Sequence, residues 1–276
     1  MKAPKQILNK LDIKTLESIS ASALQTTDYI PKLQQADKDI KGKTRDILWT
    51  VYNKEGFNRF MKVVDNMRTF KGRDFNDVIQ VKGEVAEVVL DVIINQFVKE
   101  REIADWFIYK GLILGNKNNK KFSTEIDLLL VTPQVVSIFE VKSYNGDKII
   151  FDDCMIRAKN DHRTFEKDAF AQNRVHIKAF WDNFSNCALS KTGVVKSVLF
   201  LFSEGDVTDE REYDKKLLMP VFTEKTAPEY LQALFSLNKA KGWEVNTLVK
   251  SLDKAQKEAR SADDHISYVK SLGHEL

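Results

Sequence analysis

Residues 124–148, TEIDLLLVTPQVVSIFEVKSYNGDK, contain two apolar runs with the composition of a buried β-hairpin. Three charged residues lie within or at the edge of these runs: Asp127, Glu140 and Lys142. Moving a charge into such strands costs several kcal/mol unless the charge is paired or binds a metal ion. We therefore expect these three side chains to interact with one another or with a bound cation.

The turn of this hairpin is predicted at Pro133 and Gln134. Proline cannot adopt the positive φ of a two-residue hairpin turn, so a four-residue loop around a type I turn is favoured. A turn centred between these residues places Asp127 opposite Glu140, with Cβ atoms ~5 Å apart. Because side chains alternate along a strand, Glu140 and Lys142 project to the same face. A one-residue shift of register would remove this juxtaposition.

Two carboxylates this close repel each other unless a cation lies between them. Together they form a hard oxygen site of the kind that holds Mg²⁺ or Mn²⁺. A lysine on the same face can orient or deprotonate a water molecule, or stabilise charge on a phosphate. This is the chemistry of metal-assisted phosphodiester hydrolysis. The structural alternative is a buried Glu140–Lys142 ion pair at a sheet edge, with Asp127 capping a strand.

The composition limits the other classes of protein. The chain has 276 residues, of which 43% are hydrophobic and 30% charged, as in an ordinary globular protein. A net charge of only +3 means that contact with nucleic acid would come from a local patch. Cys154 and Cys187 form neither a disulfide framework nor a C-x-x-C motif, so we expect reduced thiols. The N-terminal segment is not a signal peptide and no stretch is long enough to span a membrane, so a cytoplasmic location is expected.

The order of predicted elements indicates an α/β fold with a mixed central sheet flanked by helices. Residues 1–78 are predicted to be helical and polar, with breaks at Gly42 and Gly56, and residues 79–99 form the clearest helix. Strands are predicted at 106–114, within 124–142, at 193–203 and at 216–223, with a polar loop at 115–121. Residues 147–161 are predicted to form either a short strand pair or a strand and a loop. Helices are predicted at 166–184 and 226–272, the last interrupted at Gly242. We predict a helical N-terminal region (1–78), a core (79–225) and a helical C-terminal region (226–276).

An acid, a hairpin and a Glu-x-Lys motif resemble the PD-(D/E)XK nuclease superfamily, which has a restriction-endonuclease-like core. The finer resemblance is to the nuclease-related domain (NERD) family. It covers roughly residues 79–223 and is carried by four pieces in order. These are KGEVAE (82–87), the hairpin with the SYNG that follows Lys142, AQNRVHIKAF (171–180) and SVLFLFS (197–203).

The resemblance implies a role for each matching residue. Asp127 and Glu140 would bind the metal ion, and Lys142 would be the catalytic lysine. Glu87 would be the helix acid that completes the metal site, directly or through water. Gln172 would lie near the lysine or the scissile phosphate.

Three positions qualify this assignment. The proline that names the superfamily is replaced by Ile126, as is common in the NERD family, and Ala86 stands where the helix motif has a second glycine. On a helical wheel Glu84 lies nearer the apolar face than Glu87, so periodicity alone favours Glu84 as the inward acid. The motif favours Glu87, which we adopt as the prediction.

Other polar residues of the region receive simpler interpretations. His176 and Asn173 are interpreted as packing or surface residues, since a mechanism based on a lysine and a metal needs neither. A group of lysines precedes Asp127, and we expect them either to contact phosphates near the metal or to be ordinary surface residues. These are Lys110, Lys117, Lys120 and Lys121.

The resulting hypothesis is a Mg²⁺- or Mn²⁺-dependent nuclease that hydrolyses phosphodiester bonds in DNA, with RNA as the second choice of substrate and no membrane partner. A nuclease with helical additions fits a role in DNA processing or in defence against foreign DNA, by analogy of fold alone. The alternative is a non-catalytic module of nuclease fold that binds nucleic acid or a protein. The helical termini are candidates for homodimerisation or for docking a protein partner.

Overall fold

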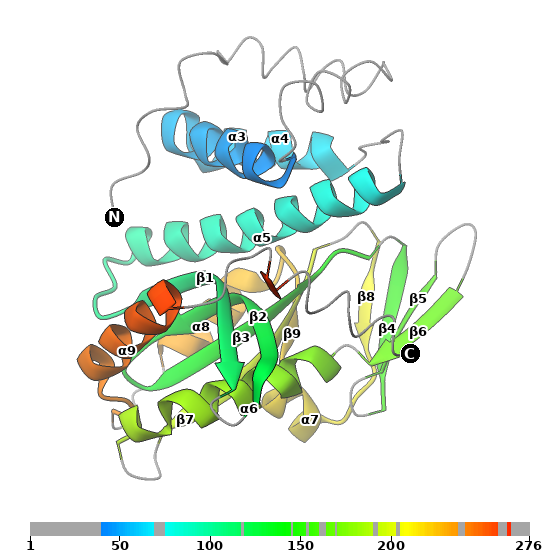
Figure 1. The fold of residues 1–276 in the computed structure, drawn as a ribbon. Helices are drawn as coiled ribbons and strands as arrows, with labels where there is room; N and C mark the ends of the chain where they lie inside the picture. The colour runs from blue at the N-terminus through cyan, green and yellow to red at the C-terminus, as the bar shows by residue number, and fades with distance from the viewer. Residues whose placement is uncertain are drawn as a thin grey trace. The chain divides into compact units, whose positions relative to one another are not determined.

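The chain divides into two compact units, residues 1–96 and 97–276, and each is described by itself. The description rests on a computed structural model, drawn in Figure 1. The described residues are 40–68, 75–116, 119–144, 146–152, 155–159, 164–168, 170–189, 193–202, 205–236, 241–258 and 264–265. The boundary between the units lies within one long helix, and the domain boundaries predicted at 78 and 225 stay predictions.

The described part of the first unit is helical, as predicted. Helix α3 spans Ile40–Glu55, and α4 spans Phe57–Arg68. Gly56 separates them with φ +81°, a conformation that glycine adopts without steric cost. The break predicted at Gly42 is wrong, because that residue lies inside α3. Residues 1–39 and 69–74 of the predicted helical region lie outside the described residues.

Helix α5, Phe75–Glu100, confirms the helix predicted at 79–99 and extends it at both ends. Valine restricts side-chain rotation in a helix, so a valine-rich helix depends on burial for its stability. That burial is observed: Val81, Val85, Val88, Val89, Val92 and Phe97 are all buried. Val81 to Gln96 of the helix belong to the first unit, and Phe97 onward belongs to the second.

The second unit is built on a five-stranded sheet with the order β1-β2-β3-β7-β9. Its strands are β1 (Phe107–Asn116), β2 (Asn119–Val131), β3 (Val135–Lys142), β7 (Val194–Leu201) and β9 (Val221–Phe222). β1, β2 and β3 pair antiparallel, whereas β7 runs parallel to β3, and β9 runs parallel to β7. The sheet is therefore mixed, and the predicted fold class is confirmed (Figure 1).

The β2–β3 hairpin has the predicted register. Leu128 pairs with Phe139, and Val131 pairs with Val136, so the turn is centred between Pro133 and Gln134. The turn is closed by Thr132, whose N–H donates to the carbonyl oxygen of Val135 at 3.0 Å. The hydroxyl oxygen of Thr132 accepts a 3.1 Å bond from the N–H of Val135. Asp127 and Glu140 are the next residues beyond the last pair of this ladder.

The polar loop predicted at 115–121 is wrong, because β1 and β2 form one long hairpin through most of that segment. Apolar periodicity ends before the strands do, since backbone pairing continues through polar residues. Within this hairpin Gly111 and Asp127 do not form a ladder pair, although the pairs on both sides of them have the same register. Gly111 has φ +55° in the middle of β1. The backbone is therefore irregular directly beside Asp127.

One face of the five-stranded sheet is covered by helices α6 (Ala171–Phe184) and α9 (Val245–Glu258). Their apolar side chains share a core with those of β1, β2 and β3. Val136 and Ile138 belong to this core, and by the alternation of side chains Glu140 and Lys142 project to the same face of β3. Trp243 is also part of it, and its Nε1–H donates to the carbonyl oxygen of Val194 at 3.1 Å. The C-terminal helix thus packs on the same core as the hairpin.

A second sheet of four strands, with the order β6-β5-β4-β8, was not predicted (Figure 1). Its strands are β4 (Asp147–Phe151), β5 (Met155–Lys159), β6 (Thr164–Asp168) and β8 (Val207–Asp209). Of the two alternatives predicted for residues 147–161, the strand pair is the one observed, as β4 and β5. The helix predicted from residue 166 begins only at Ala171, because Thr164–Asp168 pairs with β5 instead.

The last part of the chain agrees in outline with the prediction. β7 confirms the strand predicted at 193–203. The strand predicted at 216–223 shrinks to β9, because Tyr213–Leu218 forms the short helix α7. Helix α8 spans Ala227–Phe235, and Gly242 lies between it and α9, where the interruption was predicted. In the part of the chain that the structure describes, no helix is both long and apolar enough to cross a membrane.

Candidate active site

Glu140 and Lys142 lie together at the end of β3, on the face toward α6. Their side chains point the same way because they are two residues apart in a strand. The ammonium Nζ of Lys142 donates to Oε1 of Glu140 and, at 3.2 Å, to Oε1 of Gln172. The side chain of Glu140 is fully buried, whereas that of Lys142 is 28% exposed. The ion pair therefore joins a buried carboxylate, that of Glu140, to a partly exposed lysine side chain.

Asp127 is fixed beside this pair by the backbone of β3. Its Oδ2 accepts a hydrogen bond of 2.8 Å from the N–H of Val141, the residue between Glu140 and Lys142. The N–H of Val141 lies beyond the last backbone pair between β2 and β3, and it donates to this carboxylate instead. A hydrogen bond to a charged acceptor is a strong one. The predicted neighbourhood of Asp127, Glu140 and Lys142 is present in the structure.

The pKa values of the group reflect its crowding. Burial, and then the negative charge of Asp127, raise the pKa of Glu140, while Lys142 opposes the shift. Burial by itself would lower the pKa of Lys142, but the charge and hydrogen bond of Glu140, together with the charges of Asp127 and Tyr144, raise that pKa. The two acids and one ammonium group sum to a charge of −1 when all are ionised. A site with this surplus of negative charge attracts a cation.

Helix α6 supplies the other wall of the site. Gln172 and His176 are one helical turn apart, so they lie on the same face of α6. Gln172 accepts from Lys142, and Nδ1 of His176 lies 3.6 Å from Oε2 of Glu140. His176 is fully buried, and burial together with the charges of Lys142 and His265 lowers its pKa to about 4. It is therefore a neutral imidazole at neutral pH.

Asn173 has the structural role that was predicted for it. Its Nδ2 donates to the carbonyl oxygen of Val198 at 3.1 Å and to that of Ile138 at 3.4 Å. These two carbonyl groups belong to the adjacent strands β7 and β3, so Asn173 joins α6 to both. The contact sets the position of the helix against the strand that carries Glu140.

The two candidate acids of α5 belong to the first unit, where both pair with one arginine. Nη2 of Arg45 lies 3.1 Å from Oε2 of Glu84 and 2.9 Å from Oε2 of Glu87. Glu84 is the more buried, with 5% of its side chain exposed against 25% for Glu87. This agrees with the helical wheel. The choice of Glu87 as the metal-site acid stays a prediction.

The donor set in the second unit suits a hard divalent cation. Asp127 and Glu140 provide carboxylate oxygens, the ligands that Mg²⁺ and Mn²⁺ prefer. In the described part of residues 97–276, no three His, Cys, Asp or Glu side chains gather into a metal-binding cluster. Mg²⁺ commonly takes only one or two protein carboxylates and completes its shell with water and substrate phosphate. The residues present fit such a site.

The lysines predicted to lie near Asp127 are placed differently by the long β1–β2 hairpin. Asp127 lies eight residues after Asn119, the first residue of β2, so Asn119 is about 27 Å along the strand from it. Lys110 is opposite Leu128, on the other face of the sheet from Asp127. Lys117 lies outside the described residues, as do the side chains of Lys120 and Lys121. The expectation that this group adjoins the metal site is therefore wrong for the hairpin tip and for Lys110.

Tyr144 belongs to the electrostatic surroundings of the site, although sequence reasoning gave it no role. Burial raises the pKa of its phenol, with Lys142 lowering it and Glu140 raising it. His176 was also assigned too simply, as a packing residue. The spacing of four residues from Gln172 was the signal in the sequence that could have placed His176 at the site.

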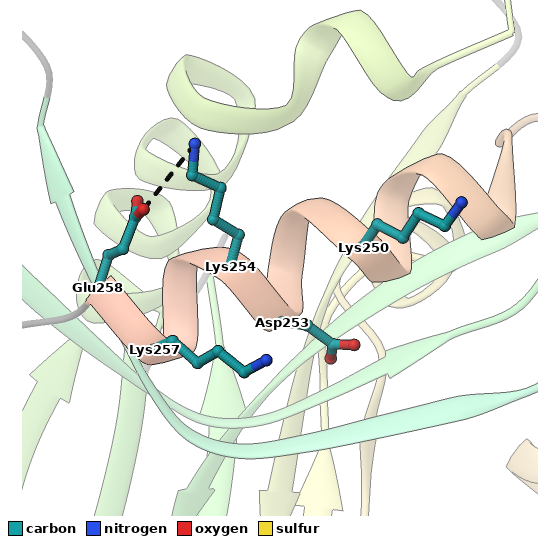
Figure 2. A pocket seen from close by; sticks show the side chains of 5 residues that line it. All are labelled: Lys250, Asp253, Lys254, Lys257 and Glu258. Atoms are coloured by element: carbon teal, nitrogen blue, oxygen red, sulfur yellow. Dashed lines mark ion pairs between the residues drawn. The ribbon is translucent and has the colours of Figure 1, made fainter.

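A shallow hollow of about 350 Å³ lies elsewhere, along α9 (Figure 2). It is lined by Lys250, Asp253, Lys254, Lys257 and Glu258, all from this one helix. Lys254 points toward Glu258, with 3.8 Å between Nζ and Oε1 (Figure 2). Oδ1 of Asp253 accepts a 2.8 Å bond from the hydroxyl of Tyr109. The hollow contains no predicted site residue, so it is a helix surface rather than the site of chemistry.

Residues 82–201 match the family described as nuclease-related domain (NERD). The matched segment begins at Lys82 and contains the hairpin, helix α6 and strand β7, and so includes every residue proposed for the site. This segment of the chain is therefore similar to a nuclease-related domain. A search of curated proteins returned no match for the chain. The match covers the same four motifs on which the resemblance rests, up to Leu201.

Proposed function

We propose that the protein is a Mg²⁺- or Mn²⁺-dependent nuclease that hydrolyses phosphodiester bonds, with DNA as the first candidate substrate and RNA as the second. The observation that carries the proposal is the Glu140–Lys142 pair, with Asp127 held beside it by the N–H of Val141. A fully buried glutamate next to a second acid lowers stability unless cations compensate the negative charge of the two acids. The NERD domain supports the same class of chemistry.

Asp127 and Glu140 would hold the metal ion, with Glu87 as the predicted third acid. When bound, the ion would lower the pKa of a water molecule and offset negative charge on the phosphate. The N–H of Val141 holds Oδ2 of Asp127, and Lys142 holds Oε1 of Glu140. Each acid is thus held through one oxygen by a group that lies on β3.

Lys142 has the geometry to act on the substrate. An ammonium group has three N–H donors, and the contacts with Glu140 and Gln172 use two of them. The third can donate to a phosphate oxygen or to the attacking water. The raised pKa of Lys142 keeps it charged, so it stabilises the developing negative charge. Gln172 limits where the ammonium group can point.

The test is a cleavage assay on plasmid, linear and single-stranded DNA and on RNA, with Mg²⁺, with Mn²⁺ and with EDTA. Lys142→Ala should reduce the rate by about 100-fold or more, the usual scale for loss of a positioned catalytic group. Lys178→Ala is the matched control, because Lys178 is an exposed lysine of α6 that pairs with Asp182. Equal activity of Lys142→Ala and Lys178→Ala on every substrate would contradict the proposal.

The alternative function is a non-catalytic nuclease fold that binds nucleic acid or a protein partner, through the helical termini in the second case. Binding of DNA or RNA in a mobility-shift assay, without cleavage under any metal condition, would support it. A homodimer would be seen by size-exclusion chromatography with light scattering. A role in DNA processing or in defence against foreign DNA, and a cytoplasmic location, are part of the proposal and rest on the nuclease assignment.

A further inference from the structure

Helix α6 carries a buried imidazole directed at the proposed metal ligand Glu140. Nδ1 of His176 lies 3.6 Å from Oε2 of Glu140, and both side chains are fully buried. Among the described residues, neither nitrogen of His176 nor Oε2 of Glu140 has a hydrogen-bond partner. Unpaired polar atoms in the interior are rare, because each costs about 1–3 kcal/mol. A donor and an acceptor left unpaired and facing each other indicate a contact that forms in another state of the protein.

We propose that His176 is a positioning residue, whose Nδ1–H donates to Oε2 of Glu140 when metal and substrate bind and holds that carboxylate in one orientation. The inference rests on the proposed function, in which Glu140 binds the metal ion. The separation of 3.6 Å exceeds hydrogen-bond range by about half an ångström. Catalytic hydrogen bonds are often long in the unliganded protein and shorten in the loaded complex.

The second oxygen of Glu140 explains why such a contact is needed. Oε1 is held by Lys142, but the terminal torsion of a glutamate is soft and a single contact leaves the carboxylate plane free to turn. A donor at Oε2 removes this freedom. His176 is itself fixed, because Asn173 joins the same stretch of α6 to strands β3 and β7. Partners of this kind change metal affinity by roughly 10- to 100-fold.

The tautomer of His176 is a direct test that needs neither metal nor substrate. A neutral imidazole carries one N–H, and the negative charge on Oε2 of Glu140, 3.6 Å from Nδ1, favours the proton on Nδ1 even before the hydrogen bond forms. Histidine ¹⁵N NMR should show His176 in the Nδ1–H form, assigned among the four histidines with His176→Asn. Glu140→Gln should shift its Nδ1 resonance. An Nε2–H tautomer, or a resonance indifferent to Glu140→Gln, would overturn the inference.

Variants separate the hydrogen bond from simple packing. The side-chain amide of Asn places a donor near the position of Nδ1, that of Gln places one near Nε2, and Leu has no donor. Calorimetric Mn²⁺ titration should therefore give nearly wild-type affinity for His176→Asn. The affinity should be roughly 10- to 100-fold weaker for His176→Gln and His176→Leu. Equal affinity in all three variants, or His176→Asn as weak as His176→Leu, would contradict the assignment.

The failure of the two proposals can be told apart. If wild type binds Mn²⁺ with the expected variant order but cuts no nucleic acid, the nuclease proposal fails and the role of His176 stands. If wild type cuts nucleic acid while His176→Leu keeps its Mn²⁺ affinity and its kcat, the role of His176 fails and the nuclease proposal stands. If the variants do not fold, the tautomer of wild-type His176 decides. If wild type binds neither Mn²⁺ nor Mg²⁺, both proposals fail.

Discussion

The backbone N–H of Val141 donates a hydrogen bond of 2.8 Å to Oδ2 of Asp127, at the point where the ladder between β2 and β3 ends. The side chain of Asp127 therefore accepts the hydrogen bond that a backbone carbonyl group accepts in a regular ladder. The bond joins a structural need, a satisfied N–H, to a chemical one, a carboxylate held beside Glu140. The two needs can be separated by mutation.

Asp127→Asn should fold almost as stably as wild type but lose metal binding. The amide oxygen of Asn can still accept from Val141, whereas its missing charge weakens Mn²⁺ binding by at least about 100-fold. Asp127→Ala should lose the bond as well, at a cost of about 1.5–3 kcal/mol in the free energy of unfolding. Urea denaturation and Mn²⁺ calorimetry measure the two effects. Equal stability of the Asn and Ala variants would show that the Val141 bond does not contribute.

Two glycines should respond to alanine in opposite directions. Gly111 has φ +55° beside Asp127, so Gly111→Ala should lower the free energy of unfolding by about 1–2 kcal/mol. Gly83 lies inside α5, and nothing lies within 4 Å of where its Cβ would be. Gly83→Ala should therefore raise the free energy of unfolding by about 0.5–1 kcal/mol. Chemical denaturation of both variants gives the comparison, and a loss of stability in Gly83→Ala would contradict it.

The loss of folding stability at acid pH should depend on Asp209. Burial alone would raise the pKa of Asp209, but the hydrogen bonds and charge of Arg211 lower it below its ordinary value of 3.8. Nε and Nη2 of Arg211 donate to the two carboxylate oxygens at 2.9 Å and 2.8 Å. Because the folded pKa is depressed, this contribution to stability is present above pH 3.8 and is lost as the pH falls through the folded pKa.

Asp209→Asn should accordingly lower the free energy of unfolding by about 1.5–3 kcal/mol near pH 7. The difference from wild type should shrink as the pH falls below the ordinary pKa of aspartate. Urea denaturation at several pH values measures it, and Asp206→Asn, at an exposed position in the turn before β8, serves as the control. A difference that stays constant down to the lowest pH would show that the ionised carboxylate is not its source.

The C-terminal helix should be needed for the stability of the second unit. Trp243 is buried to 1% exposure, and Leu248 and Leu252 of α9 share a core with Leu112 of β1. Trp243→Ala should cost about 3–5 kcal/mol. Trp243→Phe should lower the free energy of unfolding by about 1 kcal/mol, because it loses the bond to the carbonyl oxygen of Val194. The smaller ring also leaves a cavity, which adds to this loss.

Removal of residues 226–276 tests the same point on a larger scale. It would expose the apolar side chains of β1 that α9 covers, so we expect loss of the cooperative thermal transition and rapid proteolysis. A shortened chain that melts like the full one would instead support the domain boundary predicted at 225.

The β2–β3 hairpin and the side chains that meet within it could be predicted from local rules. Side chains alternate with a period of two along a strand, and Pro133 excludes the shortest turn, so the register that brings Asp127 to Glu140 follows from local rules. The Glu140–Lys142 pair follows in the same way. Helix α5 was also predictable, since its apolar pattern is long.

The residues that pack against the hairpin from other elements could not be predicted in this way. The contact between His176 and Glu140 joins residues 36 apart on different elements, and it depends on how Asn173 docks α6 against two strands. The second sheet was missed because β6, TFEKD, is short and charged and β8 has three residues. Such strands are specified by the partners that they pair with, and periodicity within the segment carries little of that information.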